Sequence, residues 1–198
     1  MASDFHTHFV HPGKMELVNG GKGNAPLWSL PFHPWATSKI PENTEPDFQE
    51  CTAVGELGFD RYRGALAYPE EQLSLLRQLL RKAADYGKPV VLHAVGAADH
   101  LFVCKKEFKE LRFLVHGFSK HNPRLLKQLL DNGFYVSLHP ALTGDEELKA
   151  FLKSCPGCRV GLETDDRNDL AIEELYEKIN IPGFEKAADL HFREFLQL

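Results

Sequence analysis

Six side chains able to bind a metal ion stand at the downstream ends of short apolar runs scattered along this chain. Imidazole and carboxylate groups are common protein ligands of divalent cations. In a parallel barrel the downstream ends of all strands open on one face, so residues far apart in the sequence can meet there and hold a pair of metal ions. The six residues are His6, His8, Glu56, His93, His116 and Asp165.

His6 and His8 lie in the segment Asp4-Phe5-His6-Thr7-His8. Side chains in a strand alternate between its two faces, so both imidazoles point to one side and can reach a single ion. Asp4 shares that side and could orient a ligand. Taken alone, one such pair of histidines, or a single histidine such as His93, is more often an ordinary surface or core residue than a metal ligand. The combination of all six at strand ends argues against coincidence.

The remaining sequence predicts the strands and helices that must position these side chains. Apolar runs alternate with helical patterns, which specifies parallel strands joined by right-handed crossovers. The clearest helix begins at Pro69, has Glu70 and Glu71 in its first turn, and ends at Gly87. We expect further helices at 123–131, 145–153 and 170–198, the last broken near 181–183, and seven strands at 3–8, 27–32, 51–57, 89–92, 113–115, 134–138 and 159–163.

These elements predict an α/β fold, a TIM-barrel-like parallel β/α barrel of about seven strands. The chain has 198 residues, which suits a single domain over 1–198 with one sizeable core. Cys155 and Cys158 form a single CxxC segment around Pro-Gly, which favours a tight turn over a zinc or redox site.

Composition limits the classes of function. Charged residues make up 26% of the chain and hydrophobic residues 43%, as in an ordinary globular protein. A net charge of −5 offers no general attraction to a phosphate backbone, which argues weakly against a dedicated DNA-binding module. No apolar run approaches the roughly 20 residues of a membrane span, and the first residues lack the pattern of a signal peptide. We therefore expect the protein to be located in the cytoplasm and to have no membrane partner.

Six segments of the chain, in order, resemble the signature motifs of TatD-type metal-dependent hydrolases, a family often described as deoxyribonucleases. This resemblance implies a TIM-barrel-like fold and a dinuclear metal site. It places His6, His8, Glu56 and Asp165 around one ion and His93 and His116, with Glu56 as a bridge, around the other. The segments are Asp4-Phe5-His6-Thr7-His8, Phe32-His33-Pro34-Trp35, Val54-Gly55-Glu56-Leu57-Gly58-Phe59-Asp60, Pro89-Val90-Val91-Leu92-His93, Leu114-Val115-His116-Gly117-Phe118-Ser119 and Leu162-Glu163-Thr164-Asp165.

The chain departs from the family pattern at three places. Only 24 residues separate His8 from His33, where the family usually has a helix and another strand, so we expect one β/α unit to be absent. The family usually has an arginine after the histidine of its fifth strand, whereas in this chain Ala94-Val95 follows His93. Asp166-Arg167 stands where the family usually has a small residue and proline.

The candidate metal ligands predict a metal-activated hydrolysis. Two divalent ions roughly 3.5–4 Å apart lower the pKa of a shared water and clamp the oxygens of a phosphoryl or carbonyl group. Asp165 is the candidate to take the proton of that water. Glu163 could relay or orient the proton, or serve as a structural carboxylate. His33 could hold a leaving group or phosphate oxygen, or only stack on Trp35. The imidazoles favour Zn²⁺, Mn²⁺ or Fe²⁺ over Mg²⁺, and no single metal is selected.

Three functions are compatible with these residues. The first is a phosphodiesterase or exonuclease, TatD-like, acting on DNA or another phosphodiester. The second is an amidohydrolase acting on a small cyclic amide or ester, since the same scaffold supports that chemistry and the acidic chain suits a small substrate. The third is a catalytically silent metal-binding homologue. Arg61, Tyr62 and Arg63 follow the Glu56 strand and could contact a phosphate, although exposed basic residues in such loops are more often only solvated. No oligomeric state is predicted.

Overall fold

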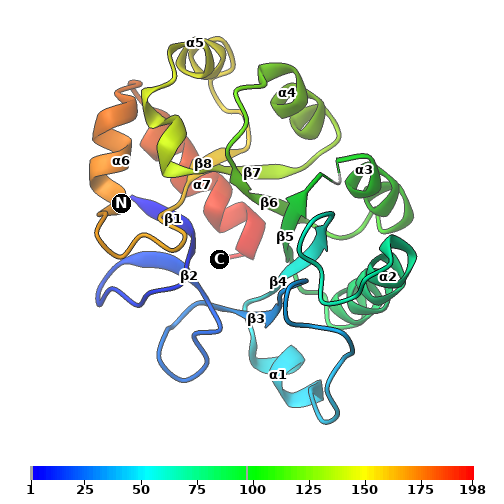
Figure 1. Cartoon of the computed structure of the whole chain (residues 1–198). Coiled ribbons are helices and arrows are strands. Elements are labelled where there is room, and N and C mark those ends of the chain that lie inside the picture. The colour runs from blue at the N-terminus through cyan, green and yellow to red at the C-terminus, as the bar shows by residue number, and fades with distance from the viewer. Residues whose placement is uncertain (1, 97) are drawn as a thin grey trace.

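A closed barrel of eight parallel strands forms the centre of the molecule in the computed structural model, which describes residues 2–96 and 98–198 (Figure 1). Each strand pairs with the next in sequence, and β1 closes the ring by pairing with β8, where Asp4 lies opposite Leu162. The TIM-barrel-like prediction is confirmed. The strands are β1 (Ser3–Thr7), β2 (Met15–Asn19), β3 (Trp28–Phe32), β4 (Ala53–Asp60), β5 (Val90–Val95), β6 (Phe113–Phe118), β7 (Tyr135–Leu138) and β8 (Val160–Leu162).

The prediction of seven strands with one β/α unit absent is wrong in its strand count. β2 pairs with β1 at Ser3–Met15 and with β3 at Val18–Trp28, so the barrel has its full eight strands. The sequence signal for β2 is weak because the strand is only five residues long and Gly20 and Gly21 follow it directly. The connections 8–14 and 20–27 contain no helix. The barrel therefore lacks crossover helices on this side rather than a strand.

Helices cover the rest of the barrel wall (Figure 1). The predicted helix at Pro69 is present and begins at that residue, and the break near residue 181 separates the last two helices as expected. The short α1 precedes β4, and a 3₁₀ turn, η1, follows β7. The elements are α1 (Glu45–Glu50), α2 (Pro69–Asp85), α3 (Ala98–Glu107), α4 (Pro123–Asp131), η1 (Pro140–Gly144), α5 (Glu146–Ser154), α6 (Ile172–Ile179) and α7 (Phe184–Leu196).

The last helix, α7, lies across the amino-terminal end of the barrel (Figure 1). Its Phe192 packs on Phe5 of β1 with ring centroids 5.1 Å apart, and Phe195 packs on Tyr135 at the start of β7 with centroids 5.3 Å apart. The guanidinium of Arg112 donates a hydrogen bond to the carbonyl of Phe195 at 2.8 Å. With this end closed by apolar packing, the carboxyl-terminal end is the one left for ligands.

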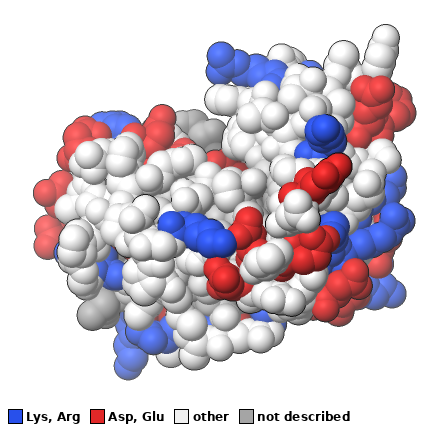
Figure 2. All heavy atoms as spheres, turned by 90° about the horizontal axis from the view of Figure 1, so that it is seen from below, with Lys and Arg blue, Asp and Glu red and all other residues white. Residues whose placement is uncertain are grey.

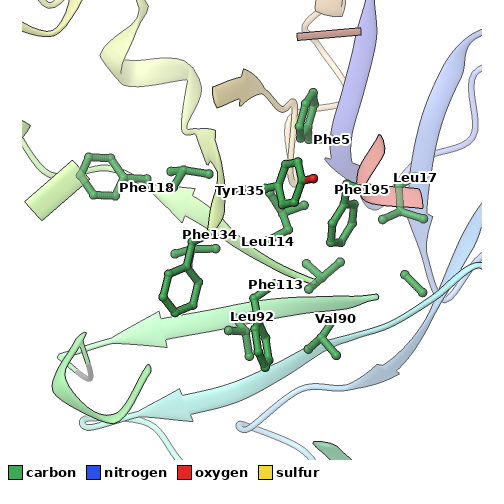
Figure 3. Packing of buried hydrophobic residues seen from close by; sticks show 14 of the residues in the cluster. Phe5, Leu17, Val90, Leu92, Phe113, Leu114, Phe118, Phe134, Tyr135 and Phe195 are labelled. Carbon is green, nitrogen blue, oxygen red and sulfur yellow. The ribbon is translucent and has the colours of Figure 1, made fainter. Parts of the chain in front are cut away.

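The apolar core continues from α7 into the barrel interior, and Figure 3 shows part of it, including Phe5, Leu17 and Phe195. Phe5 is fully buried and lies against the backbone of β8. A Cβ atom on Gly161 would lie 2.1 Å from Cε2 of the Phe5 ring, so only glycine fits there. This close approach lets the short strand β8 complete the barrel beside β1.

The surface carries charges of both signs. On the face in Figure 2, Lys and Arg side chains are interspersed with Asp and Glu, so this face presents no broad field of one sign. Cys155 and Cys158 are free thiols in a turn closed by the hydrogen bond from Cys158 N to Cys155 O, as the Pro-Gly pair predicts. Across the described residues, no helix combines the length and apolarity needed to span a bilayer.

Candidate metal centre

Glu56 on β4 is the central side chain of the site and is almost completely buried. Its carboxylate oxygen Oε1 lies 3.5 Å from His6 Nε2 and 3.1 Å from His8 Nε2. His6 is inside β1 and His8 follows the end of that strand. The alternation predicted for this segment therefore brings both imidazoles to the same carboxylate oxygen.

The other oxygen of Glu56, Oε2, faces three further histidines. The Nε2 atom of His116 lies 2.7 Å away, while Nδ1 of His93 and Nε2 of His33 each lie 3.3 Å away. His93 and His116 come from β5 and β6, and His33 follows β3. One buried carboxylate thus has a separate group of imidazoles at each of its oxygens.

Asp165 lies beside the first of these groups. Its Oδ1 atom is 3.5 Å from His8 Nε2 and 3.7 Å from His6 Nε2. The backbone of Asp165 has a φ of 54°, a left-handed conformation that aspartate and asparagine tolerate better than most residues. Hydrogen bonds of 3.0 Å from Asp165 N to His6 O and from His8 N to Asp165 O hold it in place. The six predicted ligands therefore meet at one end of the barrel.

The ring nitrogens of His6 and His116 fit a metal-binding role. All four nitrogens are buried and lack a hydrogen-bond partner among the described residues. Buried polar atoms without partners are rare in folded proteins and call for a ligand. Burial lowers the pKa of His6 to about 4, which leaves its imidazole neutral and its lone pair free to bind a cation.

The charges of the cluster are strongly coupled. Burial by itself would raise the pKa of Glu56, but the surrounding imidazoles of His116, His33, His6 and His8 outweigh it and hold that pKa well below its usual range. Contacts with Asp165 and Glu56 raise the pKa of His8 to about 9. The carboxylate of Glu56 is thus ionised at neutral pH, which is the form that binds a cation.

Four triads among these side chains place one potential ligand atom each within 4.8 Å of the others. The cluster is therefore suited to binding metal. The triads are His6–Glu56–His116, His6–His8–Asp165, His33–Glu56–His93 and His116–Glu163–Asp165.

Glu163, predicted to relay a proton or to be structural, is fully buried at the end of β8. Its Oε2 accepts a hydrogen bond from Ser137 and its Oε1 accepts one from Gly117 N at 2.6 Å. Oε2 also lies 3.9 Å from Nδ1 of His116. Burial raises the pKa of Glu163 well above its usual range. These contacts tie Glu163 to the strand that carries His116.

His33 contacts both Trp35 and the metal cluster. Its ring packs edge-on against Trp35 with centroids 4.7 Å apart, and its Nε2 also faces Glu56. The His33 side chain is about one-fifth exposed, so it borders solvent and the metal cluster together. It lines a pocket of about 380 Å³ together with Trp35, Asp166 and every metal-binding candidate except His6.

The sequence analysis assigned no role to two polar residues that contact the cluster. Asn19 at the end of β2 donates from Nδ2 to Glu56 Oε1 at 3.1 Å and accepts at Oδ1 from Glu56 N, also at 3.1 Å. Asp60 at the end of β4 lies 3.3 Å from His93 Nε2 through its Oδ2 atom. Asp60 could have been found from the sequence, because it belongs to the Gly-Glu-Leu-Gly-Phe-Asp segment and ends a strand. Asn19 could not, because the sequence did not reveal the strand that carries it.

Comparison with known proteins identifies relatives of this chain. A Danio rerio protein named "Putative deoxyribonuclease tatdn3" is 26% identical over 119 residues, which cover 59% of this chain and 44% of that protein. The match therefore spans less than half the length of that curated relative.

Solved structures share the fold at low sequence identity. The TatD homologue YJJV from Escherichia coli K12 aligns over 100% of this chain and 98% of that chain, with a TM-score of 0.78 and 19% identity. A TatD family hydrolase from Entamoeba histolytica aligns over 100% and 93%, with a TM-score of 0.61 and 16% identity. A dihydroorotase from Campylobacter jejuni covers 87% and 65%, with a TM-score of 0.55 and 12% identity.

The family model described as TatD related DNase matches residues 15–181. The match begins after His6 and His8 and includes Glu56, His93, His116 and Asp165. Because it covers most of the chain, this protein belongs to the TatD-related DNase family.

Proposed function

We propose that this chain is a metal-dependent hydrolase that cleaves phosphodiester bonds of DNA, a TatD-like deoxyribonuclease or exonuclease that uses two divalent metal ions. The observation that carries the proposal is the environment of Glu56. Its two carboxylate oxygens face two different groups of imidazoles, with His6 and His8 at Oε1 and His93 and His116 at Oε2. A carboxylate in that position is suited to bridging two cations.

The residues divide between the two ions by their distances. His6, His8 and Asp165, with Oε1 of Glu56, would hold one ion, and His93 and His116, with Oε2, would hold the other. Bound there, the ions would lower the pKa of a water molecule and polarise a phosphoryl oxygen. The imidazole-rich set suits Zn²⁺, Mn²⁺ or Fe²⁺ better than Mg²⁺.

Asp165 accepts the proton of the attacking water. Burial would raise the pKa of its carboxyl group, but His8, His116 and His6 outweigh that effect and lower it. The side chain is therefore ionised at neutral pH and able to take a proton. It is about one-fifth exposed and lines the pocket, so water and substrate can reach it.

His33 and Glu163 serve the same reaction in different ways. His33 borders the pocket and its Nε2 is directed to the cluster, so it can bind a phosphate oxygen or assist the leaving group. Glu163 is buried beside His116 and accepts a hydrogen bond from the backbone of Gly117. Its role is to position His116 rather than to contact the substrate.

DNA is the substrate favoured by the relatives. The family model and the Danio rerio relative both carry a deoxyribonuclease in their names. The paired ligand groups around Glu56 also suit phosphoryl transfer, in which two cations stabilise the attacking and leaving oxygens.

The test replaces Asp165 by asparagine and measures cleavage of an oligodeoxynucleotide and of bis(p-nitrophenyl) phosphate with added Mn²⁺. Asparagine tolerates the left-handed backbone of residue 165, so the fold is retained. Loss of the proton acceptor should reduce turnover by about 10²- to 10⁴-fold. The control is Asp131→Asn, an equal change of charge on the exposed face of α4, where the aspartate pairs with Lys127.

Metal content measured on the same preparations separates the possible causes of inactivity. The proposal expects Asp165→Asn to retain metal while losing activity. Full activity in that variant would overturn the role of Asp165. A wild-type protein that hydrolyses a cyclic amide or ester but neither phosphodiester would replace the phosphodiesterase assignment with an amidohydrolase.

A further inference from the structure

Exposed aromatic side chains gather on two loops next to the metal cluster. Trp35 follows β3 and is 46% exposed, while Tyr62 and Tyr68 follow β4 and are 76% and 65% exposed. Within the described residues, these three are the only Phe, Trp or Tyr side chains classed as exposed. Trp35 also lines the pocket that holds the metal-binding candidates. Leaving large aromatic rings in solvent is unfavourable, so their concentration here points to a ligand surface.

The two loops are held together by direct contacts. The backbone of Ala65 donates a hydrogen bond of 2.6 Å to the carbonyl of Pro34. The guanidinium of Arg63 lies over the Trp35 ring, 4.6 Å from its centroid, in a cation–π contact. Trp35, Tyr62 and Arg63 thus belong to one connected surface, which we call the aromatic rim.

One buried carboxylate organises this aromatic rim. Asp60 accepts hydrogen bonds at Oδ1 from the backbone nitrogens of Tyr62 and Arg63, at 2.8 and 3.0 Å. Its Oδ2 accepts from the indole Nε1 of Trp35 at 2.6 Å. Asp60 is only 1% exposed, so these donors compete with little solvent. The positions of all three members of the aromatic rim therefore depend on Asp60.

The same carboxylate connects the aromatic rim to the metal cluster. Oδ2 of Asp60 lies 3.3 Å from Nε2 of His93, and Nδ1 of His93 lies 3.3 Å from Glu56. A group that rests on the aromatic rim is thereby held at a set distance from the reacting centre. This is the relationship expected between a substrate-positioning surface and the bond that is cut.

The loop after β5 leaves room for the aromatic rim. Gly96 has a φ of 67°, and a Cβ atom there would lie 3.2 Å from Arg61 Cβ and 3.6 Å from Cε2 of Tyr62. The Tyr62 ring therefore has Gly96 on one side and remains open to solvent elsewhere.

Positive charge accompanies the aromatic rings. Arg61 and Arg63 are exposed, and neither forms a salt bridge with any residue that the structure describes. Their guanidinium groups remain available to a phosphate, which arginine binds through paired donors. Rings for bases beside cations for phosphates are the two components of a sequence-tolerant nucleic-acid site.

We propose that Trp35, Tyr62 and Arg63 bind the unpaired terminal nucleotide of the substrate strand, with its base stacked on the aromatic rim and its phosphate held by Arg61 and Arg63. This inference rests on the proposed phosphodiesterase function. It gives an acidic protein a local means of holding a polynucleotide without a broad basic surface. The aromatic rim is a positioning surface, because it contacts the base and the phosphate oxygens of this nucleotide and leaves the reacting phosphorus to the metal cluster.

The test compares two fluorescent oligothymidylates that differ only in the terminal base. One is intact, and the other has an abasic residue at its end, so every phosphate is retained; both 3′ and 5′ versions are used. Binding is measured by anisotropy with Mn²⁺ and the Asp165→Asn variant of the whole chain, which we expect to cut the strand too slowly to affect the measurement. Stacking is worth enough that the intact strand should bind at least about fivefold more tightly than the abasic strand for one of the two ends.

Tyr62→Ala is the decisive variant, because Tyr62 is highly exposed and its replacement leaves no cavity. In this variant the intact and abasic strands should bind almost equally, whereas Tyr62→Phe keeps the ring and should keep the preference. Arg81→Ala removes an exposed positive charge from α2, away from the aromatic rim, and should also keep the preference. Retention of the preference in Tyr62→Ala, or its absence in the parent protein, overturns the proposal.

Cleavage of the same oligonucleotide by the wild-type chain reports separately on the proposed function. A base preference in binding without cleavage would reject the phosphodiesterase and leave the aromatic rim as a nucleotide-binding surface. Cleavage without a base preference would reject the aromatic rim and leave the enzyme.

Discussion

Asn19 and Glu56 hold each other through two hydrogen bonds of 3.1 Å. The amide nitrogen Nδ2 of Asn19 donates to Oε1 of Glu56, and the amide oxygen Oδ1 accepts from the backbone N–H of Glu56. Asn19 therefore sets both the side-chain direction and the backbone position of the residue at the centre of the cluster. This contact depends on β2, the strand that lies directly between β1 and β3 in the barrel.

Replacing Asn19 by alanine should weaken metal binding by about 10- to 100-fold, because residues that orient a metal ligand contribute on that scale. Calorimetric titration of Mn²⁺ into chelator-treated protein measures the effect. Ser29→Ala is the matched control, since Ser29 reaches Asn19 only through a longer hydrogen bond of 3.3 Å. Unchanged affinity in Asn19→Ala would show that Glu56 is oriented without it.

Metal should stabilise the fold through the same cluster. A ligand that binds only the folded protein adds about 2.7 kcal/mol to the free energy of unfolding at a hundredfold excess over its dissociation constant. We expect added Mn²⁺ or Zn²⁺ to raise the urea midpoint of the wild-type protein and a chelator to reverse the change. Glu56→Gln, which removes the charge facing both groups of imidazoles, should lose most of this gain. An equal gain in both proteins would place the bound metal elsewhere.

Gly161→Ala should destabilise the barrel by about 1–3 kcal/mol, the usual cost of overpacking a filled core. The new methyl group would lie 2.1 Å from the Phe5 ring, which is itself held by Phe192 of α7. Urea unfolding followed by circular dichroism measures the loss. The control is Gly144→Ala, where a Cβ atom meets nothing within 4 Å and the backbone has no strained positive φ. Equal stability of the two variants would mean that Phe5 can move aside.

Asp145 should stabilise α5 in a pH-dependent way. It is the N-cap of that helix, and its Oδ1 accepts a hydrogen bond from Leu148 N at 3.0 Å. This hydrogen bond, with the contact from His121, lowers the pKa of Asp145 below its ordinary value of 3.8. Because the folded-state pKa is the lower one, the charge contributes fully above pH 3.8 and its contribution is lost as the pH falls through the folded-state value.

Asp145→Ala should therefore cost about 1 kcal/mol near neutral pH, whereas Asp145→Asn, which is also a good N-cap, should cost less. The difference between wild type and Asp145→Asn isolates the charge and should shrink as the pH falls below 3.8 and through the folded-state pKa. Urea midpoints at several pH values provide the measurement. A difference that grows on acidification would contradict the assignment.

The sequence alone predicted the type of fold and a set of candidate ligands that the barrel brings together, because both depend on local patterns. Short apolar runs ending in His6, His93, His116 or Asp165 identified the strands and the face they share. The helix at Pro69 was predicted correctly because proline, acidic residues and apolar spacing all agreed. These signals lie within a few residues of each other, so they are readable before the chain is folded.

Only the tertiary structure decided how these parts meet. Met15–Asn19 is too short and too closely followed by glycine to be recognised alone, and it becomes a strand because β1 and β3 supply backbone partners on both sides. Asp60 gains its role from Trp35 and His93, which are 25 and 33 residues away in the chain. Strand pairing and side-chain hydrogen bonds of this kind are long-range, so the number of strands, the contact of Asn19 with Glu56 and the aromatic rim appear only when the barrel closes.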